Sequence, residues 1–364
     1  MSELRAVWQP TNRYFVARQV FLIFTKLSTD INLEIITSVR LLNATYLASN
    51  SNLKLAIGQS GSEPKTIILP AGAGPADRMP ERIGGGDDET CLYVSVDNER
   101  WAAGVPAGRL QGWERELHPE YPTTKTYKAL FHAALLMAET ESIDLVVTGL
   151  PVSQFHEPQR KSDLLKRLKG VHQVTPKRSI TVHDVKVLPQ PAGAYMDLVQ
   201  TGGDLGLIEE GRVVVIDPGF FSVDWVALEA GEIRYSSSGT SLQAMSVLLE
   251  TIDKLISEDH GAKVGMDRLE KAMRTGDLQV LLFGEKVDIS PYLNAAMKKV
   301  APVALTAMRQ SMRDESINAD LVLIAGGGAL AYKEAAKEIF SRSKIIVPEQ
   351  SVLANVRGFW FYGA

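Results

Sequence analysis

Residues Arg212–Trp225 read RVVVIDPGFFSVDW, and the interpretation of the whole chain begins from this stretch. Four apolar residues, Val213–Ile216, are enough for a strand that is buried on both faces. The apolar run breaks at DPG, residues 217–219, and then resumes as a second strand that contains Asp224. Because proline and glycine suit the two central positions of a type II turn, the stretch predicts a hairpin with one carboxylate at its turn.

Two interpretations of this hairpin are open from its own residues. A turn whose backbone N–H groups point outward can cradle an anion such as a phosphate. A magnesium ion on that phosphate would offset its repulsion of Asp217, so the hairpin would bind nucleotide phosphate with Asp217 facing the metal. In the other interpretation the stretch is a surface β-turn with a solvated aspartate.

The composition is that of an ordinary globular protein and excludes several classes. The 364 residues suffice for about two domains, and 45% of them are hydrophobic. A formal net charge of −4 gives no general attraction to nucleic acid or to an anionic membrane. The single cysteine, Cys91, excludes an internal disulfide and favours a reducing cytoplasm. The longest N-terminal apolar run, Val20–Phe24, is too short to span a bilayer, and no cleavable signal pattern follows it.

Apolar periodicity outlines the elements along most of the chain. Residues 1–41 show no clear period and predict an atypical N-terminal extension, and residues 70–80 predict an irregular surface loop. The expected strands are Leu41–Ala48 and Leu53–Gly58 as a hairpin, Cys91–Val96, Arg100–Ala103, Ile143–Thr148, Ile180–Leu188, Leu321–Ala325 and Lys344–Val347. The expected helices are Thr123–Glu139, Arg160–Gly170, Leu242–Ile256, Tyr292–Met312 with a bend at Pro302, Leu330–Phe340 and Ser351–Tyr362. Strands and then helices cluster twice, which predicts two related α/β lobes with a cleft between them.

Several common motifs are absent or incomplete. The pair Lys65-Thr66 lacks the glycine that precedes the lysine of a Walker A loop, and there is no HExxH or CxxC. The basic residues of Arg160–Gly170 alternate with leucines at helical spacing, so a solvated helix face is favoured over a nucleic-acid site. A dinucleotide fingerprint, GxGxxA, does begin at Gly326. Too few residues follow it to complete the sheet of that fold, and we set it aside.

Three spaced elements together resemble the actin-like ATPases. They are PQPAGAY at residues 189–195, the D-x-G-x-x-[ST]-x-D hairpin at 217–224, and the glycine turn at 326–328. The resemblance runs from about Ala44 to the C-terminus and is strongest to plasmid segregation proteins of the ParM/StbA type. It implies a two-lobed actin-like fold, a duplicated ribonuclease H-like α/β architecture with a central nucleotide cleft.

The resemblance also implies a set of site residues. Asp217 would lie near magnesium, through water, and near the attacking water, while Gln190 would orient that water. The alternative interpretation of Gln190 is a polar residue at a strand end, but the flanking prolines and small residues favour the functional role. The implied nucleotide-binding residues are Asn52 and Lys54 in a first phosphate loop, Gly219 and Ser222 in a second, Ser238, Gly239 and Thr240 at a helix start facing the cleft, and Gly326, Gly327 and Gly328 at the adenosine turn. Asn355 and Gly358 match a hinge segment between the lobes.

The first phosphate loop departs from the family pattern D-x-G-x-x-N-x-K. Asn52 and Lys54 match its end, but Leu47 stands where the aspartate is expected and Ser49 where the glycine is expected. A leucine cannot hold magnesium or its waters. Either this half of the site has been lost, or the residues before about Asn50 reflect a wrong start or a shifted reading frame in the gene.

The implied domains are the extension 1–41, a first lobe 42–205 completed by 343–364, and a second lobe 206–342. The implied function is the binding of ATP and Mg²⁺ with slow hydrolysis, coupled to filament assembly for plasmid or DNA segregation in the cytoplasm. The implied partners are further copies of the chain and a DNA-binding adaptor, without direct contact to nucleic acid or membrane. The alternatives are a non-hydrolysing nucleotide-binding interaction protein of the same fold and a small-molecule kinase of the same superfamily.

Overall fold

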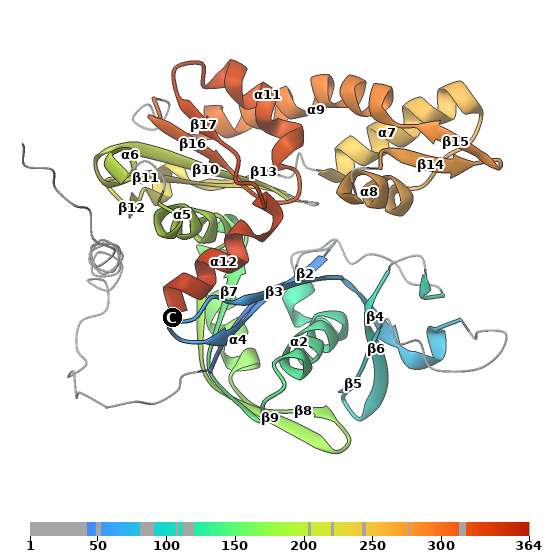
Figure 1. The fold of residues 1–364 in the computed structure, drawn as a ribbon, viewed down its shortest axis with the longest axis vertical. Helices are drawn as coiled ribbons and strands as arrows, with labels where there is room; N and C mark the ends of the chain where they lie inside the picture. Colours follow the sequence, from blue (N-terminus) through green and yellow to red (C-terminus); the bar gives the residue numbers. More distant parts are fainter. Residues whose placement is uncertain are drawn as a thin grey trace, which may run out of the picture.

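The protein consists of two lobes, each built on its own β-sheet, one below the other in Figure 1. A computed structural model describes residues 42–48, 52–80, 91–106, 109–111, 120–202, 205–219, 222–241, 245–275, 277–312 and 318–363. The expected N-terminal extension, residues 1–41, lies outside this part of the chain. No helix in the described ranges is long and apolar enough to cross a membrane.

The first lobe contains a six-stranded sheet with the order β3-β2-β1-β7-β9-β8. Its strands are β1 (Leu42–Ala48), β2 (Asn52–Gln59), β3 (Lys65–Pro70), β7 (Ser142–Leu150), β8 (Gly170–Thr175) and β9 (Arg178–Pro189). Strand β7 pairs in parallel with both β1 and β9, and most of its residues are buried, which confirms the buried strand predicted at Ile143–Thr148. The lobe's helices are α2 (Lys125–Met137), α3 (Val152–Phe155) and α4 (Pro158–Leu168). The side chain of Thr124 accepts a hydrogen bond from Tyr127 N and caps α2.

A small three-stranded sheet, with the order β4-β6-β5, corrects the expectation of an irregular loop at residues 70–80. Strand β4 (Gly72–Pro75) pairs antiparallel with β6 (Glu99–Val105), which also pairs with β5 (Leu92–Val96). Strand β4 is made of glycine, alanine and proline, and its first three residues are buried. Such small residues carry no apolar alternation, so the sequence pattern could not reveal a strand there.

The second lobe contains a sheet with the order β12-β11-β10-β16-β17, and β13 pairs with β11. Its strands are β10 (Arg212–Pro218), β11 (Val223–Glu229), β12 (Glu232–Ile233), β13 (Gly239–Ser241), β16 (Leu321–Ile324) and β17 (Lys344–Ile346). Its helices are α6 (Leu205–Glu210), α7 (Met245–His260), α8 (Met266–Thr275), α9 (Ser290–Ser311), which continues through Pro302, and α11 (Ala329–Ile339). A separate hairpin, β14 (Gln279–Leu282) with β15 (Glu285–Asp288), packs with α7 and α8 (Figure 1).

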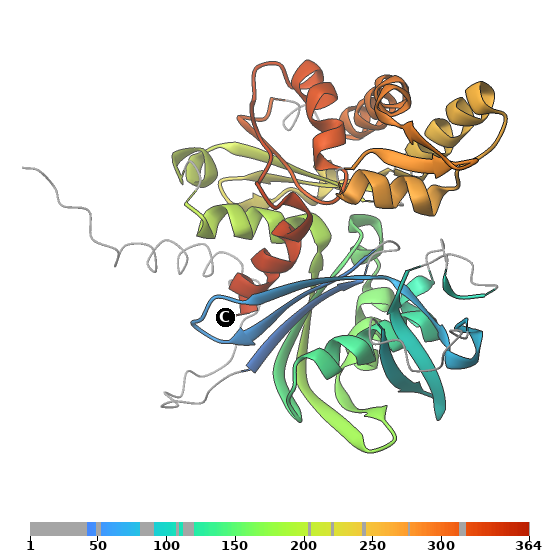
Figure 2. The ribbon, with the colours of Figure 1, turned by 45° about the vertical axis from the view of Figure 1, so that its right-hand side comes forward.

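Two helices exchange lobes. Helix α5 (Gln190–Gln200) follows β9 of the first sheet, yet its apolar residues pack under the second sheet, in one cluster with residues of β10, β11 and β16. Helix α12 (Ser351–Gly363) follows β17 of the second sheet, yet Phe359 and Trp360 pack on the first sheet. Figure 2 shows the red α12 and the yellow-green α5 lying together between the two sheets.

This exchange corrects the expected domain boundaries. Residues 343–364 were expected to complete the first lobe, but β17 pairs in parallel with β16 inside the second sheet. Only α12 returns to the first lobe, while α5, expected in the first lobe, packs on the second. A three-residue strand carries too short a pattern to indicate which sheet it joins.

Candidate functional site

The site lies where β10 and β16 end side by side in the second sheet. Because the two strands are parallel, their carboxyl ends bring Asp217 and the glycine turn after Ile324 to the same sheet edge. The predicted hairpin is confirmed, since β10 pairs antiparallel with β11, with Asp217 opposite Asp224. The expected Pro-Gly turn is wrong, because Pro218 still belongs to β10 and pairs with Val223. Gly219 N donates to the carbonyl of Ser222 at 2.8 Å and closes the turn.

Asp217 is buried, with only 7% of its surface exposed, so the solvated-turn interpretation is wrong. Its Oδ2 accepts a hydrogen bond from Asn355 Nδ2 at 2.6 Å. Its Oδ1 lies beside Gly326, where an added Cβ would be 1.9 Å away. Gly326 also has a φ of +82°, a backbone conformation that residues with a Cβ adopt only with strain. Glycine is therefore required at this position by both space and backbone.

Lys54 of the first lobe and Asp217 of the second are near enough for their charges to act on each other. Lys54 lies on β2 and is 6% exposed. Burial lowers the pKa of Lys54, and the charge of Asp217 partly restores it. Burial likewise raises the pKa of Asp217, while the Lys54 charge and the Asn355 hydrogen bond lower it. Asn52 is buried two residues earlier on the same strand, so it points to the same face as Lys54.

Asp224 joins the two lobes at a second point. It is 2% exposed, and its Oδ1 accepts hydrogen bonds from Val152 N at 3.0 Å and from Thr240 Oγ1 at 2.6 Å. Its Oδ2 accepts from Ser222 Oγ at 2.5 Å, and Thr240 Oγ1 accepts from Ser153 N at 3.0 Å. Burial raises the pKa of Asp224 to about 6, against the lowering effect of these hydrogen bonds. These hydrogen bonds connect the start of α3 in the first lobe to β11 and β13 of the second lobe.

Several residues that were expected to bind nucleotide therefore make hydrogen bonds within the protein. The hydroxyls of Ser222 and Thr240 both donate to Asp224. The Ser238 hydroxyl accepts from Ala227 N and donates to the carbonyl of Arg234. These bonds hold the hairpin and its neighbours in place around Asp217.

Residues 238–240 were expected in a loop at a helix start, but Gly239–Ser241 form strand β13, which pairs with β11. An added Cβ on Gly239 would lie 2.7 Å from Cζ2 of Trp225, so this glycine allows β13 to approach the indole ring. Serine, glycine and threonine suit a short edge strand as well as a turn, and the sequence did not separate the two.

Gln190 is the first residue of α5 and follows directly after β9. Its Cγ lies beside Gly149 at the end of β7, where an added Cβ would be 2.9 Å away. The side chain therefore stands at the carboxyl ends of two parallel strands of the first sheet, the edge at which ligands bind in open α/β sheets.

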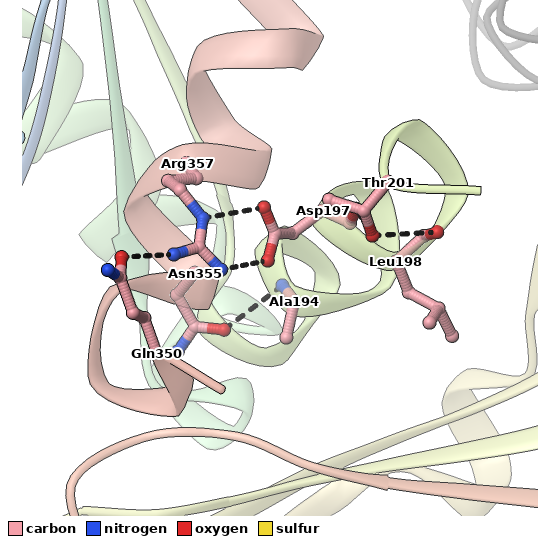
Figure 3. A network of polar contacts seen from close by, with 7 residues as sticks. All are labelled: Ala194, Asp197, Leu198, Thr201, Gln350, Asn355 and Arg357. Carbon is pink, nitrogen blue, oxygen red and sulfur yellow. Dashed lines mark hydrogen bonds and ion pairs between the residues drawn. The ribbon is translucent and has the colours of Figure 1, made fainter. Parts of the chain in front are cut away.

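Helices α5 and α12 touch backbone to backbone where they cross. An added Cβ on Gly193 would lie 2.2 Å from the carbonyl oxygen of Asn355, and one on Gly358 would lie 1.6 Å from that of Gly193. Beside this crossing, the Arg357 guanidinium donates to both carboxylate oxygens of Asp197, at 2.9 and 2.6 Å (Figure 3). Asn355 and Gly358 were matched to a hinge segment, and that match predicted neither this ion pair nor the hydrogen bond of Asn355 to Asp217. Both connect residues far apart in the chain and leave no local sequence signal.

The remaining expected residues lie in different parts of the structure. Gly328 N donates to the carbonyl of Pro218 at 3.0 Å, so the glycine turn is bonded to the hairpin. Gly327 is exposed, and an added Cβ there would meet nothing within 4 Å. Leu47 pairs with Lys54 across the β1–β2 hairpin, and Ser49 lies outside the described residues.

Comparison with known families decides the classification. Residues 50–193 match the family model for the N-terminal domain of actin-like proteins, and residues 215–338 match the C-terminal model of the archaeal MreB-like actin homologue. The chain belongs to the actin-like ATPase superfamily. Among curated proteins, no match is found.

Solved structures of actin-like proteins share the fold of this superfamily member. A non-polymerisable quadruple mutant of pCBH ParM is 20% identical, with a TM-score of 0.68 over 88% of this chain and 98% of its own. The archaeal actin homologue Ta0583, in complex with ADP, is 18% identical, with a TM-score of 0.67 over 88% and 98%. A 15-stranded ParM filament from Clostridium botulinum is 18% identical, with a TM-score of 0.68 over 89% and 99%.

Proposed function

We propose that this protein binds ATP between its two lobes and assembles into filaments in a nucleotide-dependent manner. The observation that carries the proposal is the electrostatic interaction of Lys54 and Asp217, two buried and oppositely charged groups supplied by different lobes. Buried groups whose pKa values are strongly perturbed cluster at functional sites. Here they lie beside a glycine turn that permits close backbone approach, as an adenine nucleotide would require.

The residues present fit a magnesium ion that is held mainly by the nucleotide. Magnesium in such sites is bound through one or two carboxylates together with substrate phosphates. Asp217 supplies one carboxylate, since Asn355 occupies only part of its acceptor capacity. When bound, the ion would neutralise charge on the β- and γ-phosphates.

The protein's own groups would do the remaining work. The Lys54 ammonium would stabilise phosphate charge from the first lobe, and Asp217 would hold the water shell of the ion. Gln190 would orient a water for in-line attack on the γ-phosphate, and Gly326 would let the backbone approach the nucleotide. This catalysis would consist of positioning and charge neutralisation. Slow hydrolysis is proposed by analogy of fold.

Filament assembly and a role in plasmid or DNA segregation are proposed by analogy of fold. One similar structure is a ParM filament, and filaments arise when head-to-tail contacts do not close into a ring. With a net charge of −4, contact with DNA would be made through a DNA-binding adaptor protein.

A second candidate function is supported by Leu47. Since leucine replaces the carboxylate expected in the first phosphate loop, the protein would bind nucleotide without hydrolysing it and act through its partners. Phosphate release from ATP distinguishes the two candidates, with Leu47→Asp combined with Ser49→Gly as the comparison. Equal turnover by the two proteins would show that the first loop is not limiting.

The test of nucleotide binding compares two lysines of neighbouring strands. Lys54→Met removes the buried ammonium at similar volume, and Lys65→Met, on β3, removes an exposed one. We expect the affinity for Mg-ATP to fall at least about tenfold in the first variant and to stay unchanged in the second, since tenfold corresponds to about 1.4 kcal/mol. Equal affinities would contradict the proposed site.

The test of assembly is light scattering and pelleting of the full chain with Mg-ATP, with Mg-ADP and without nucleotide. We expect assembly with Mg-ATP, and disassembly as ATP is consumed. Identical sedimentation in all three conditions would remove the filament proposal and leave nucleotide binding to be judged by the lysine variants.

A further inference from the structure

We propose that Asn355 is a positioning residue that links the crossing of α5 and α12 to the carboxylate of Asp217. Through Asn355, the relative placement of the two helices would set the geometry between Asp217 and Gln190. The inference rests on the proposed function, because it concerns the same phosphate site.

Asn355 connects three elements through two hydrogen bonds. It is 1% exposed and lies in α12. Its Nδ2 donates to Asp217 Oδ2 at 2.6 Å, at the end of β10. Its Oδ1 accepts from Ala194 N at 3.1 Å, in α5 (Figure 3). Ala194 lies one turn after Gln190, so one amide joins the helix that begins at Gln190 to the carboxylate of the other lobe.

The crossing leaves little freedom between the two helices. Gly193 and Gly358 allow backbone contact, and any shift of one helix against the other must move these packed atoms. The bidentate ion pair of Arg357 with Asp197 adds a second fixed contact beside the crossing (Figure 3). A rotation of the lobes about this crossing would therefore reach Asn355 directly.

Helix α12 also holds the glycine turn. Gly326 N donates to the carbonyl of Ser351, the first residue of α12, at 2.8 Å. The same helix is thus bonded to Gly326 through its backbone and to Asp217 through Asn355. Asp217, Gly326 and the start of α5 are all attached to this helix pair, which gives a physical route from lobe movement to the site.

An amide suits this position because it donates and accepts at once. Asn355→Asp keeps the acceptor for Ala194 N but places a second carboxylate at hydrogen-bond distance from Asp217. Two carboxylates at hydrogen-bond distance share one proton. The introduced aspartate and Asp217 would therefore keep this proton at pH values at which Asp217 alone is ionised. The other charged groups that act on this pair are Lys54 on β2 and Asp224 on β11.

The experiment measures the affinity for Mg-ATP between pH 5.5 and 8.5 in the full-length protein. For Asn355→Asp we expect a loss of at least tenfold at pH 8.5 that recovers towards pH 5.5. The matched control is Arg357→Gln, which removes the neighbouring ion pair without touching Asp217, and its pH profile should parallel that of the wild type. Asn355→Ser, which is shorter and cannot span both partners, should lose affinity at every pH without changing the profile.

The outcomes separate the two proposals. If the wild type binds no nucleotide at any pH, the proposed function fails and the inference fails with it. If the wild type binds but Asn355→Asp follows its pH profile, the positioning role is refuted and the nucleotide site stands. Should Asn355→Asp fail to fold, wild-type affinity in Asn355→Ser would refute the positioning role in the same way.

Discussion

Replacing Gly326 with alanine should destabilise the protein strongly, whereas the same change at Gly327 should not. Gly326 has a φ of +82°, and its added Cβ would lie 1.9 Å from Oδ1 of Asp217. Gly327 is its direct neighbour, and its added Cβ would meet nothing within 4 Å. The two variants therefore add the same methyl group one residue apart.

The magnitude follows from two contributions. The left-handed backbone costs alanine about 1–2 kcal/mol relative to glycine. The Asp217 carboxylate must also move away from the new methyl group, which breaks its bond to Asn355, and a lost buried hydrogen bond to a charged group costs about 1.5–3 kcal/mol. We expect Gly326→Ala to lose about 2.5–5 kcal/mol and Gly327→Ala to stay within about 0.5 kcal/mol of the wild type.

The assay is urea unfolding in the absence of nucleotide, followed by circular dichroism at one pH for all three proteins. The loss should appear as a lower denaturation midpoint with an unchanged slope, because the surface exposed on unfolding stays the same. If Gly326→Ala unfolds at the same urea concentration as Gly327→Ala, the buried contact between Gly326 and Asp217 does not exist as described.

Three further predictions concern stability. The pKa of Asp224 is raised to about 6, so between this value and that of the unfolded state the folded protein binds the extra proton, and stability gains as the pH falls. Between pH 7.5 and 4.5 this gain amounts to about 2 kcal/mol, since about 1.5 pH units lie below the pKa of about 6 at about 1.4 kcal/mol per unit. Asp224→Asn should abolish the gain in urea unfolding, and parallel pH dependences would contradict this. Gly358→Ala should lower the melting temperature through a loss of about 1–3 kcal/mol, since its Cβ would overlap the carbonyl of Gly193, and an unchanged melting temperature would contradict the helix crossing. Thr124→Ala should cost about 1 kcal/mol by removing the cap of α2, while Thr124→Ser should cost much less, and equal losses would exclude capping as the cause.

The sequence predicted those parts of the fold that have local signals. The apolar runs before Asp217 and before Gly326 indicated buried strands, and the break in the first run indicated a hairpin, although β10 continues into the expected Pro-Gly turn. The helix expected at Thr123–Glu139 was predicted for the same reason, and α2 lies within it. Each of these features depends on residues within a few positions of one another.

The parts that the sequence did not predict depend on distant residues. Asn355 and Asp217 are 138 positions apart, and no periodicity or motif records their hydrogen bond. The hydroxyl of Thr240 was expected to face a nucleotide, but it is bonded to Asp224, a partner set by strand pairing. Strand β17 was assigned to the wrong lobe because its sheet is chosen by tertiary packing and not by its three residues.

The exchange of helices between the lobes means that neither lobe is a separable folding unit. A break in the chain between residues 202 and 205 would leave one fragment with the buried face of α5, including Tyr195, exposed to water. The same fragment would lack Phe359 and Trp360, which cover its own sheet. Each fragment alone should aggregate, whereas the two produced together should reassemble, each supplying the helix that the other needs. Soluble, folded single lobes would contradict this expectation.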